Sequence, residues 1–312
     1  MPADDGAILD NLTHSLAGAL LGQIGLKRLS GRAMPTLIIA ANLPDIDALT
    51  TLLGTPSLAL RRGLTHGPIA LLLLPIVLTG LVMAWDRWRP RADAAPVRPA
   101  ALLLLATIGT LSHPALDWLN SYGIRLLEPF SSKWFAGDTL FIIDLWLWAA
   151  LITGVWVSRR RERTGTLHSA RPALAALAAI CVYIFANGLI TGRAEHAASA
   201  RLAELRIAPK LVVANPVPVM FWRRTLLWRD AARYGEGEFA LGKGVARLGR
   251  AAPLRIDDPR LAALAARPDV AAFLFWSRMP IVVDDAAGRA FLTDQRFASG
   301  IARGRFAIAL DR

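Results

Sequence analysis

The chain is built of long apolar blocks, and a small set of ionisable residues lies inside these blocks or at their ends. Hydrophobic residues make up 54% of its 312 residues, which is more than an ordinary soluble domain carries. Six blocks are long enough to cross a hydrocarbon core of roughly 30 Å. They cover residues 9–26, 34–53, 68–86, 99–119, 139–157 and 172–191. The sequence therefore predicts a membrane protein, an all-α bundle of about six transmembrane helices.

The distribution of basic residues predicts the orientation of these helices. The net charge is +12, but the basic residues lie mostly in short loops and not on one face of a soluble fold, so we expect no direct nucleic-acid binding. Twelve Lys and Arg follow the first, third and fifth blocks, and four follow the second and fourth. Because cytoplasmic loops carry the excess positive charge, everything after residue 191 is predicted to lie on the periplasmic side of a bacterial inner membrane. The acidic start, MPADDGAILD, predicts no cleavable signal peptide.

The sequence changes character after the sixth block. From residue 211, short aromatic and β-branched segments alternate with Gly, Pro and Asp, and DDAAGR (284–289) is typical of a hairpin turn. DPRLAALAAR (258–267) predicts a helix that Asp257 or Asp258 can cap. We expect a transmembrane helical domain with the metal site, a connecting helix, and a small soluble, mostly antiparallel α+β domain outside the membrane. These regions cover residues 1–192, 193–210 and 211–312, respectively.

Six ionisable residues of the apolar segments map to the same outer face of this topology. They are His14, Asp45, Asp47, His66, His113 and Asp117. The charge count behind the topology did not use them. Ionisable groups in a bilayer are costly and are usually kept for a binding or reaction site, and zinc accepts both His and Asp ligands. We therefore expect one or two divalent metal ions, zinc in the first place, bound by His14, Asp45, His66, His113 and Asp117.

The motif SHPALDW places His113 and Asp117 four residues apart, on one face of a helix. Gly109 and Asn120 or Ser121 continue this stripe of small and polar residues, which we expect to face other helices. A His and a carboxylate at this spacing recur as joint metal ligands. The alternative is a hydrogen-bonded pair that only holds two helices together.

The motif NLPDID combines a proline with two carboxylates. Because Pro44 disfavours helix at Leu43, the second span is predicted to be interrupted there, as at many intramembrane ion sites. Asp45 and Asp47 could reach one metal or bridge two. The alternative is an Asp-rich turn that emerges into water.

Histidines also lie near the starts of two other spans. His66, in RRGLTHGP, directly precedes a Gly-Pro pair that can begin the third span. Arg61 and Arg62 suit an anionic, phosphate-bearing substrate, although binding to lipid headgroups is an equal alternative. His14 alone would more often be a structural hydrogen-bonding residue, and the neighbouring motifs make it a candidate ligand.

Two further acids lie in GDTLFIID, residues 137–144. Asp138 is expected to cap the fifth helix. Asp144 has apolar neighbours and is a candidate ligand, a support for a ligand, or a general base. His168, in an Arg-rich loop, and His196, beyond the sixth block, are expected to be bystanders.

With these motifs the chain resembles the YdjM-like family of membrane-bound, metal-dependent hydrolases, described as LexA-binding and inner-membrane-associated. The resemblance covers about the first 145 residues. It rests on DNLTHSLAGALLG, ANLPDID, RGLTHG, SHPALDWLNSYG, EPFS and FIID. The His and Asp set is also similar to that of the zinc-dependent phospholipase C and nuclease P1 group. We find no second His-x-x-x-Glu or Asp pair of that group here, which favours one or two metals over three.

Together these features predict an inner-membrane hydrolase, surrounded by membrane lipids, that acts on an amphipathic or lipid-linked phosphoester. A metal would lower the pKa of a bound water to about 7. Asp47 or Asp144 is the expected general base, and Arg61 or Arg62 would stabilise charge on the phosphoryl oxygens. The alternative is a non-catalytic scaffold or regulator whose His/Asp cluster is structural or metal-sensing and whose C-terminal domain binds a protein partner. A transporter is disfavoured because no repeats are visible.

Overall fold

The computed structural model describes residues 5–91, 95–298, 304 and 306–311. The chain divides into two compact units. A helical unit comprises Met1–Leu49 and Arg61–Ala186, and a sheet unit comprises Thr50–Leu60 and Asn187–Arg312. The long helix α6 begins in the first unit and ends in the second.

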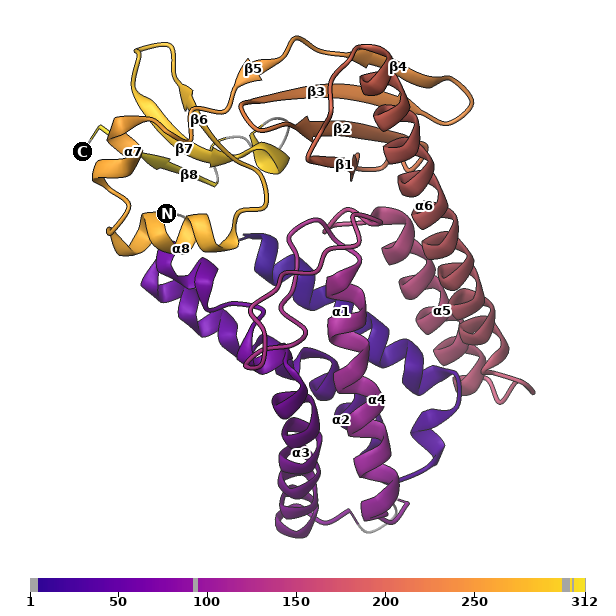
Figure 1. Ribbon diagram of the computed structural model, residues 1–312. Helices are drawn as coiled ribbons and strands as arrows, with labels where there is room; N and C mark the ends of the chain where they lie inside the picture. Colours follow the sequence, from indigo (N-terminus) through magenta and orange to yellow (C-terminus); the bar gives the residue numbers. More distant parts are fainter. Residues whose placement is uncertain (1–4, 92–94, 299–303, 305, 312) are drawn as a thin grey trace. The chain divides into compact units, whose positions relative to one another are not determined.

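The helical unit consists of helices joined by short connections (Figure 1). Its α-helices are α1 (Asp5–Gln23), α2 (Ala33–Asn42), α3 (Pro68–Trp88), α4 (Pro99–Trp118), α5 (Leu145–Arg163) and the first part of α6 (Arg171–Glu204). Short 3-10 helices are η1 (Leu26–Arg28), η2 (Leu43–Leu53), whose last residues belong to the sheet unit, and η4 (Leu64–His66). The predicted interruption at Pro44 is confirmed, because α2 ends at Asn42 and the chain continues as a 3-10 helix.

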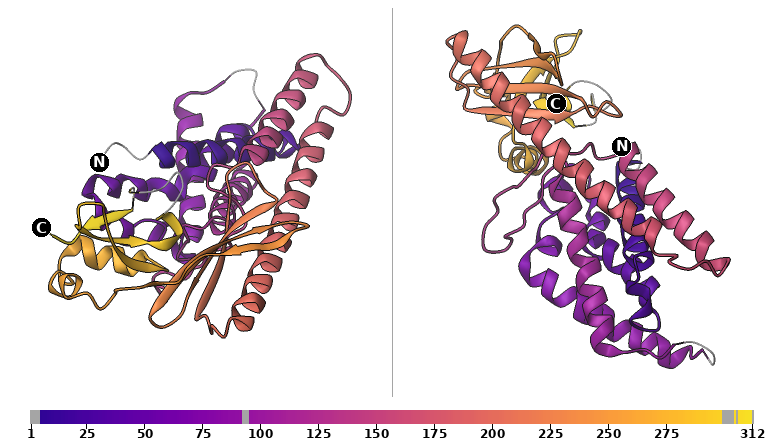
Figure 2. Two further views of the ribbon diagram at one scale, coloured as in Figure 1. Left: turned by 90° about the horizontal axis from the view of Figure 1, so that it is seen from above. Right: turned by 90° about the vertical axis from the view of Figure 1, so that its right-hand side faces the viewer.

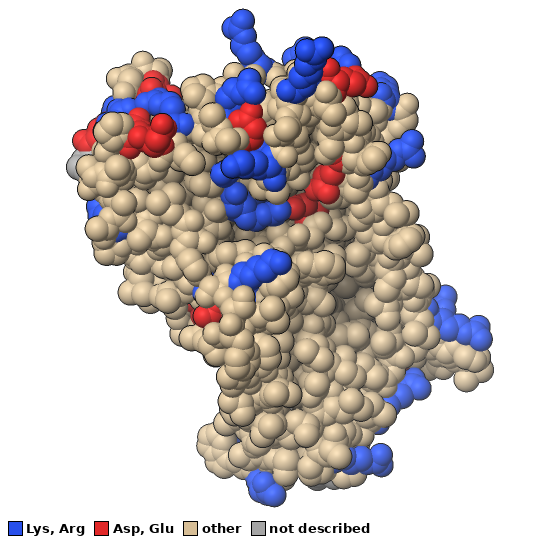
Figure 3. Space-filling model, viewed as in Figure 1, with Lys and Arg blue, Asp and Glu red and all other residues tan. Residues whose placement is uncertain are grey.

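Four segments of the described chain are long and apolar enough to cross a membrane. They are Ala33–Leu53, Pro68–Trp88, Pro99–Trp118 and Arg171–Glu204. Apolar side chains such as Leu72 and Leu81 of α3 are more than half exposed, as lipid contact requires. On the face in Figure 3, the surface over α3 and α4 is almost free of charge, and Lys and Arg gather at the far ends of these helices.

The first and fifth predicted spans correspond to α1 and α5, which are not among these four segments. The predicted start of the fifth span at residue 139 is wrong, because α5 begins at Leu145. The backbone N–H groups of Gly137, Thr139 and Leu140 donate to carbonyls at the end of α4, Trp118 and Leu119, at 2.6–2.9 Å. Residues 137–140 are thus tied to the end of α4, and the helix starts only after its N-cap Asp144, whose backbone is extended.

The polar stripe of α4 faces α2, as predicted. A Cβ atom on Gly109 would lie 2.6 Å from the Cβ of Ala40 and 3.0 Å from the carbonyl oxygen of Leu37. Only glycine permits this approach of the two helices. It brings the next turn of α4, with His113, beside the end of α2.

The sheet unit is mostly antiparallel, as predicted. Strands β1 to β4 pair in chain order, with β5 on β3, and a second sheet has the order β6-β7-β8. The strands are β1 (Leu211–Pro216), β2 (Arg223–Arg229), β3 (Arg233–Ala240), β4 (Gly244–Leu248), β5 (Ala252–Pro253), β6 (Pro280–Asp284), β7 (Ala290–Asp294) and β8 (Ala307–Ala309). The remaining helices are η3 (Thr55–Ala59), α7 (Pro259–Ala263), α8 (Pro268–Trp276) and η5 (Gln295–Phe297).

Two local predictions in this unit are confirmed. Asp258 caps α7, since its carboxylate accepts from the backbone N–H of Arg260 at 3.0 Å. The DDAAGR turn joins β6 to β7, in which Asp284 pairs with Ala290. The predicted helix after the sixth span is present as the second part of α6, which continues from that span without a break to Glu204. Figure 2 shows the first sheet lying along the later part of this helix.

A buried ion pair holds the end of β7. Asp294 accepts from Nε and Nη2 of Arg296, both at 2.9 Å, and both side chains are fully buried. Ser277 and the backbone N–H of Met279 also donate to this carboxylate. Burial alone would raise the pKa of Asp294, but the Arg296 guanidinium and these hydrogen bonds outweigh it and lower the pKa.

We expect Asp294→Asn to lower the unfolding free energy of the sheet unit by about 3 kcal/mol, because Arg296 would remain buried without its counter-charge. Because the folded-state pKa of Asp294 is lowered, its contribution is present above the unfolded value of 3.8 and is lost as the pH falls below it. Hydrogen exchange of β7 in the full chain measures both effects. Asp285→Asn, in an exposed turn, is the matched control. Equal protection in both variants would contradict the assignment.

Candidate metal centre

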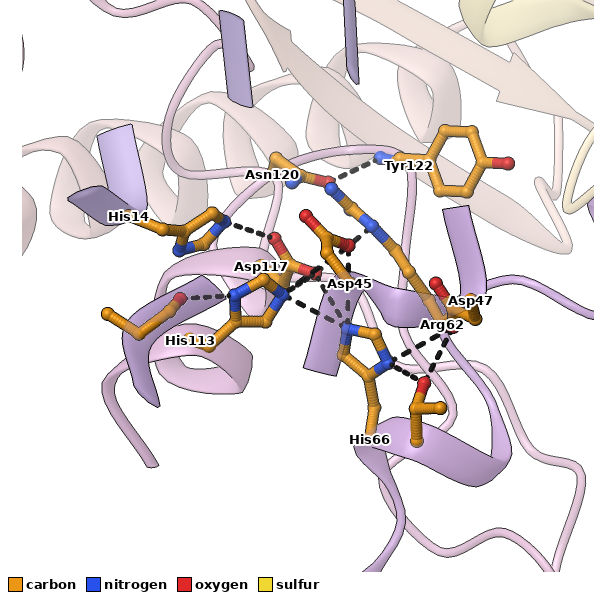
Figure 4. Close-up of polar contacts among 11 residues, drawn as sticks. His14, Asp45, Asp47, Arg62, His66, His113, Asp117, Asn120 and Tyr122 are labelled. Atoms are coloured by element: carbon orange, nitrogen blue, oxygen red, sulfur yellow. Dashed lines mark hydrogen bonds and ion pairs between the residues drawn. The ribbon is translucent and has the colours of Figure 1, made fainter. Parts of the chain in front are cut away.

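Four buried side chains from three elements converge inside the helical unit (Figure 4). Asp45 lies on η2, His66 ends η4, and His113 and Asp117 lie on successive turns of α4. Each offers one ligand atom, and these atoms lie within 4.8 Å of one another. His66 and His113 are 0% exposed, Asp117 is 1% exposed and Asp45 is 8% exposed. The fold therefore joins motifs that lie 72 residues apart in the chain, from Asp45 to Asp117.

The proton positions on His113 follow from its partners. Its Nδ1 lies 2.7 Å from the backbone carbonyl oxygen of Ala41. A carbonyl can only accept, so Nδ1 carries a hydrogen. The neutral ring then has a lone pair on Nε2, the atom that faces the cluster, 3.5 Å from Asp117 Oδ2 and 3.6 Å from Asp45 Oδ1.

The proton positions on His66 are set by Thr65 and Asp47. The Thr65 hydroxyl donates its one hydrogen to Asp47 Oδ2 at 2.7 Å. Its contact with His66 Nδ1, at 2.9 Å, must therefore be one in which the hydroxyl accepts from the ring. Nε2 of neutral His66 consequently also carries a lone pair toward the cluster.

The two Nε2 atoms of His66 and His113 are only 3.1 Å apart. Two lone pairs at this distance repel each other unless a positive species lies between them. In addition, Asp45 Oδ1 is buried without a hydrogen-bond partner, and the two carboxylate oxygens of Asp117 are held by ion-pair contacts with Arg62 and His14. Nitrogen and oxygen ligands at roughly 2.0–2.2 Å from a tetrahedral metal lie about 3.3 Å from each other. The spacings from one imidazole to the other and from the imidazoles to the carboxylates, 3.1–4.0 Å, are close to that value.

The charges of the cluster favour a divalent cation. Asp45 and Asp117 surround the two imidazoles, and Asp47 lies 3.4 Å from His66 Nδ1. The guanidinium of Arg62 is in direct contact, with Nε 3.1 Å from Asp117 Oδ2, and the charge of Arg125 also acts on Asp47. Three buried carboxylates around two imidazoles nevertheless make a site that suits a divalent cation.

Arg62 is held in a strained position beside the carboxylates. Its φ is 52°, in the left-handed region, which costs a non-glycine residue about 1–2 kcal/mol. Its backbone N–H donates to Asp47 Oδ2 at 2.8 Å, and its Nη1 donates to Asn120 Oδ1 at 3.1 Å. The guanidinium carbon lies 4.9 Å from the centre of the Tyr122 ring. Several contacts thus hold the strained residue in place.

Two glycines shape the segment that carries His66. A Cβ atom on Gly63 would lie 2.1 Å from Arg125 Nη2, and one on Gly67 would lie 1.9 Å from the carbonyl oxygen of Glu128. Glycine is therefore required at Gly67, which lies against backbone, whereas a side chain at Gly63 would have to displace the end of the Arg125 side chain. The RGLTHG motif is a close-packing motif as well as a source of a ligand.

His14 lies beside the cluster but is not one of the four converging residues. Its ring stacks on that of His113 with centroids 3.8 Å apart, and its Nε2 lies 3.3 Å from Asp117 Oδ1. This geometry allows His14 to orient Asp117. Its role as a ligand stays a prediction.

The other sequence candidates have different surroundings. Asp144, and not the predicted Asp138, is the N-cap of α5, accepting from the backbone N–H groups of Trp146 and Leu147. Tyr183 also donates to Asp144, at 2.9 Å. Asp138 instead lies buried with a left-handed φ of 47°. Arg61 is buried next to Arg62 in the chain.

Thr65 and Tyr122 were not identified from the sequence. Thr65 directly precedes His66, but nothing in the motif indicates that its hydroxyl fixes the histidine tautomer. Tyr122 follows the α4 stripe, and its contact with Arg62 joins residues that are far apart in the chain. A pattern within one segment could not have revealed either role.

The comparisons with known proteins agree with the geometry. The family model "YdjM inner membrane protein" matches residues 9–194, which include all four converging side chains. The uncharacterized protein YfhP of Bacillus subtilis (strain 168) is 26% identical over 156 residues, covering 47% of this chain and 45% of that protein. The match thus spans less than half of the relative's length. No solved structure matches the chain. On the family match, the chain belongs to the YdjM inner membrane protein family.

Proposed function

We propose that this membrane protein is a metal-dependent hydrolase that holds one divalent ion, zinc, between Asp45, His66, His113 and Asp117. The observation that carries the proposal is the 3.1 Å approach of two imidazole Nε2 atoms beside the buried carboxylates of Asp45 and Asp117. A cation between these atoms would be bound favourably by both kinds of ligand. Two imidazoles and two carboxylates are a donor set that zinc accepts.

A zinc ion here would supply a hydrolytic nucleophile at neutral pH, because coordination lowers the pKa of water to about 7. Asp47 acts as a positioning residue, since its contact with Thr65 keeps Nε2 of His66 free of hydrogen. Arg62 offers positive charge at the edge of the site, where negative charge develops on a phosphoryl group. Asp144 keeps its capping role.

The substrate we propose is an amphipathic or lipid-linked phosphoester. Three of the four ligands lie in segments long and apolar enough to span a membrane. A substrate would therefore approach the site from the lipid or from the membrane interface. Asp45 and Asp47 are the most exposed members of the cluster, at 8% each, which makes the η2 side the expected entrance. The loop charges favour a periplasmic site and six spans.

A non-catalytic role for the metal is the second candidate. Both imidazoles are 0% exposed, whereas a catalytic metal needs a coordination position open to substrate. A scaffold or regulator would use the same cluster to fix the helices or to sense the metal. The sheet unit could then bind a protein partner.

The metal itself is tested by its retention. We expect the purified wild type to hold about one zinc ion per chain. We expect His113→Ala to lose this ion, because only three of the four ligands would remain to bind it. Elemental analysis after dialysis against a weak chelator measures this. His168→Ala, in an exposed loop, is the matched control. A metal content that is equal in all three proteins would contradict the site.

Hydrolysis is tested on phosphodiester and phospholipid substrates with zinc-loaded protein in detergent. We expect His113→Ala to fall to background, and Arg62→Lys to keep the metal but lose about 100-fold in kcat, as for loss of a transition-state donor. Zinc retention without any turnover by the wild type would favour the structural role. Turnover that survives in His113→Ala would place the reaction elsewhere.

A further inference from the structure

The helix α6 is apolar in its first part and joins the sheet unit in its second. Residues 172–191 contain no Asp, Glu, Lys, Arg or His, and Arg193 is the first charged residue after them. The side chains of Val182, Phe185 and Leu189 are 60–68% exposed. A membrane crossed by α6 therefore ends near residue 192, within the part of the helix that belongs to the sheet unit.

Arg224 fixes the start of β2 at this level of α6. It is 1% exposed, and its guanidinium donates to Thr191 Oγ1 at 3.0 Å and to Asn187 Oδ1 at 2.9 Å. Further up the helix, Glu195 accepts from the backbone N–H of Ala214 at 3.4 Å. Pro216 pairs with Arg224, so β1 runs back along α6 from the level of residue 195 toward its apolar part.

The loop between β1 and β2 carries exposed apolar side chains. Val219 and Trp222 are 47% and 41% exposed, and Leu241, whose backbone N–H donates to Trp222, is 46% exposed. Val219 has a φ of 65°, which is strained for a β-branched residue. A groove of about 420 Å³ lies among Met220, Trp222, Leu241 and neighbouring residues, with Lys243 at its wall. We call Val219, Met220, Trp222, Leu241 and Lys243 the sheet tip.

We propose that the sheet tip inserts into the interfacial layer of the membrane that α6 crosses, with Lys243 at the phosphates of anionic phospholipids. The tip lies along α6 beside its last apolar turns, where a tryptophan and aliphatic side chains are favoured at the boundary between headgroups and acyl chains. A lysine close to an anionic surface adds about 1 kcal/mol. The insertion would hold the sheet unit against the membrane independently of any reaction.

The test places a fluorescent label at either end of the first sheet. In a Cys181→Ser background, Leu241→Cys labels the tip and Ala231→Cys labels the β2–β3 turn. The seven residues of β2 separate these ends by roughly 20 Å, at about 3.3 Å per residue. The full chain is reconstituted in vesicles of phosphatidylcholine and phosphatidylglycerol that contain headgroup-level spin-labelled lipid.

We expect quenching of the Leu241→Cys label to be about threefold stronger than that of the Ala231→Cys label. Val219→Cys repeats the measurement if the first variant does not fold. Lys243→Glu should weaken quenching in vesicles with phosphatidylglycerol and leave it unchanged in pure phosphatidylcholine. Equal quenching of the two labels would overturn the insertion. So would a tip label that is already shielded from solvent in detergent, because a protein partner or a second copy of the chain would then cover the tip. If Lys243→Glu leaves quenching unchanged in vesicles with phosphatidylglycerol, the contact with anionic lipid would be overturned.

Discussion

The helical unit depends on the balance of charge in a buried space where three helical elements meet. Three carboxylates and two imidazoles lie where water cannot solvate them, and unpaired charge in such a place costs several kcal/mol per ion. Arg62 offsets one carboxylate. A divalent ion at the four ligand atoms would offset further negative charge and would tie η2, η4 and α4 together.

The contacts around this space explain why particular small residues occur in the motifs. Gly109 lets α4 approach α2, which brings the Ala41 carbonyl within 2.7 Å of His113. Gly63 and Gly67 let residues 125–128 pass close to η4. These glycines carry no chemistry themselves, but they decide where the imidazole nitrogens point.

Local rules predicted what a single segment determines. The spacing of His113 and Asp117, the break at Pro44, the cap at Asp258 and the hairpin at DDAAGR all follow from the preferences of neighbouring residues. The start of α5 could not be predicted in this way, because residues 137–140 are bound to the end of α4, a contact between segments far apart in the chain, and the helix begins only after Asp144. The N-cap of α5 was likewise assigned to the wrong acid, because Asp144 and not Asp138 accepts from the first N–H groups of the helix. The roles of Thr65 and Asp47 depend on which atom donates, and a sequence does not show that.

If two imidazoles and two carboxylates share one metal ion, X-ray absorption of protein loaded with one equivalent of zinc will show it. We expect a shell of nitrogen and oxygen ligands at about 2.0–2.2 Å, with outer scattering from two imidazoles and no sulfur. His66→Ala should reduce the imidazole count to one. A shell without imidazole, or one that His66→Ala leaves unchanged, would rule out the shared ion.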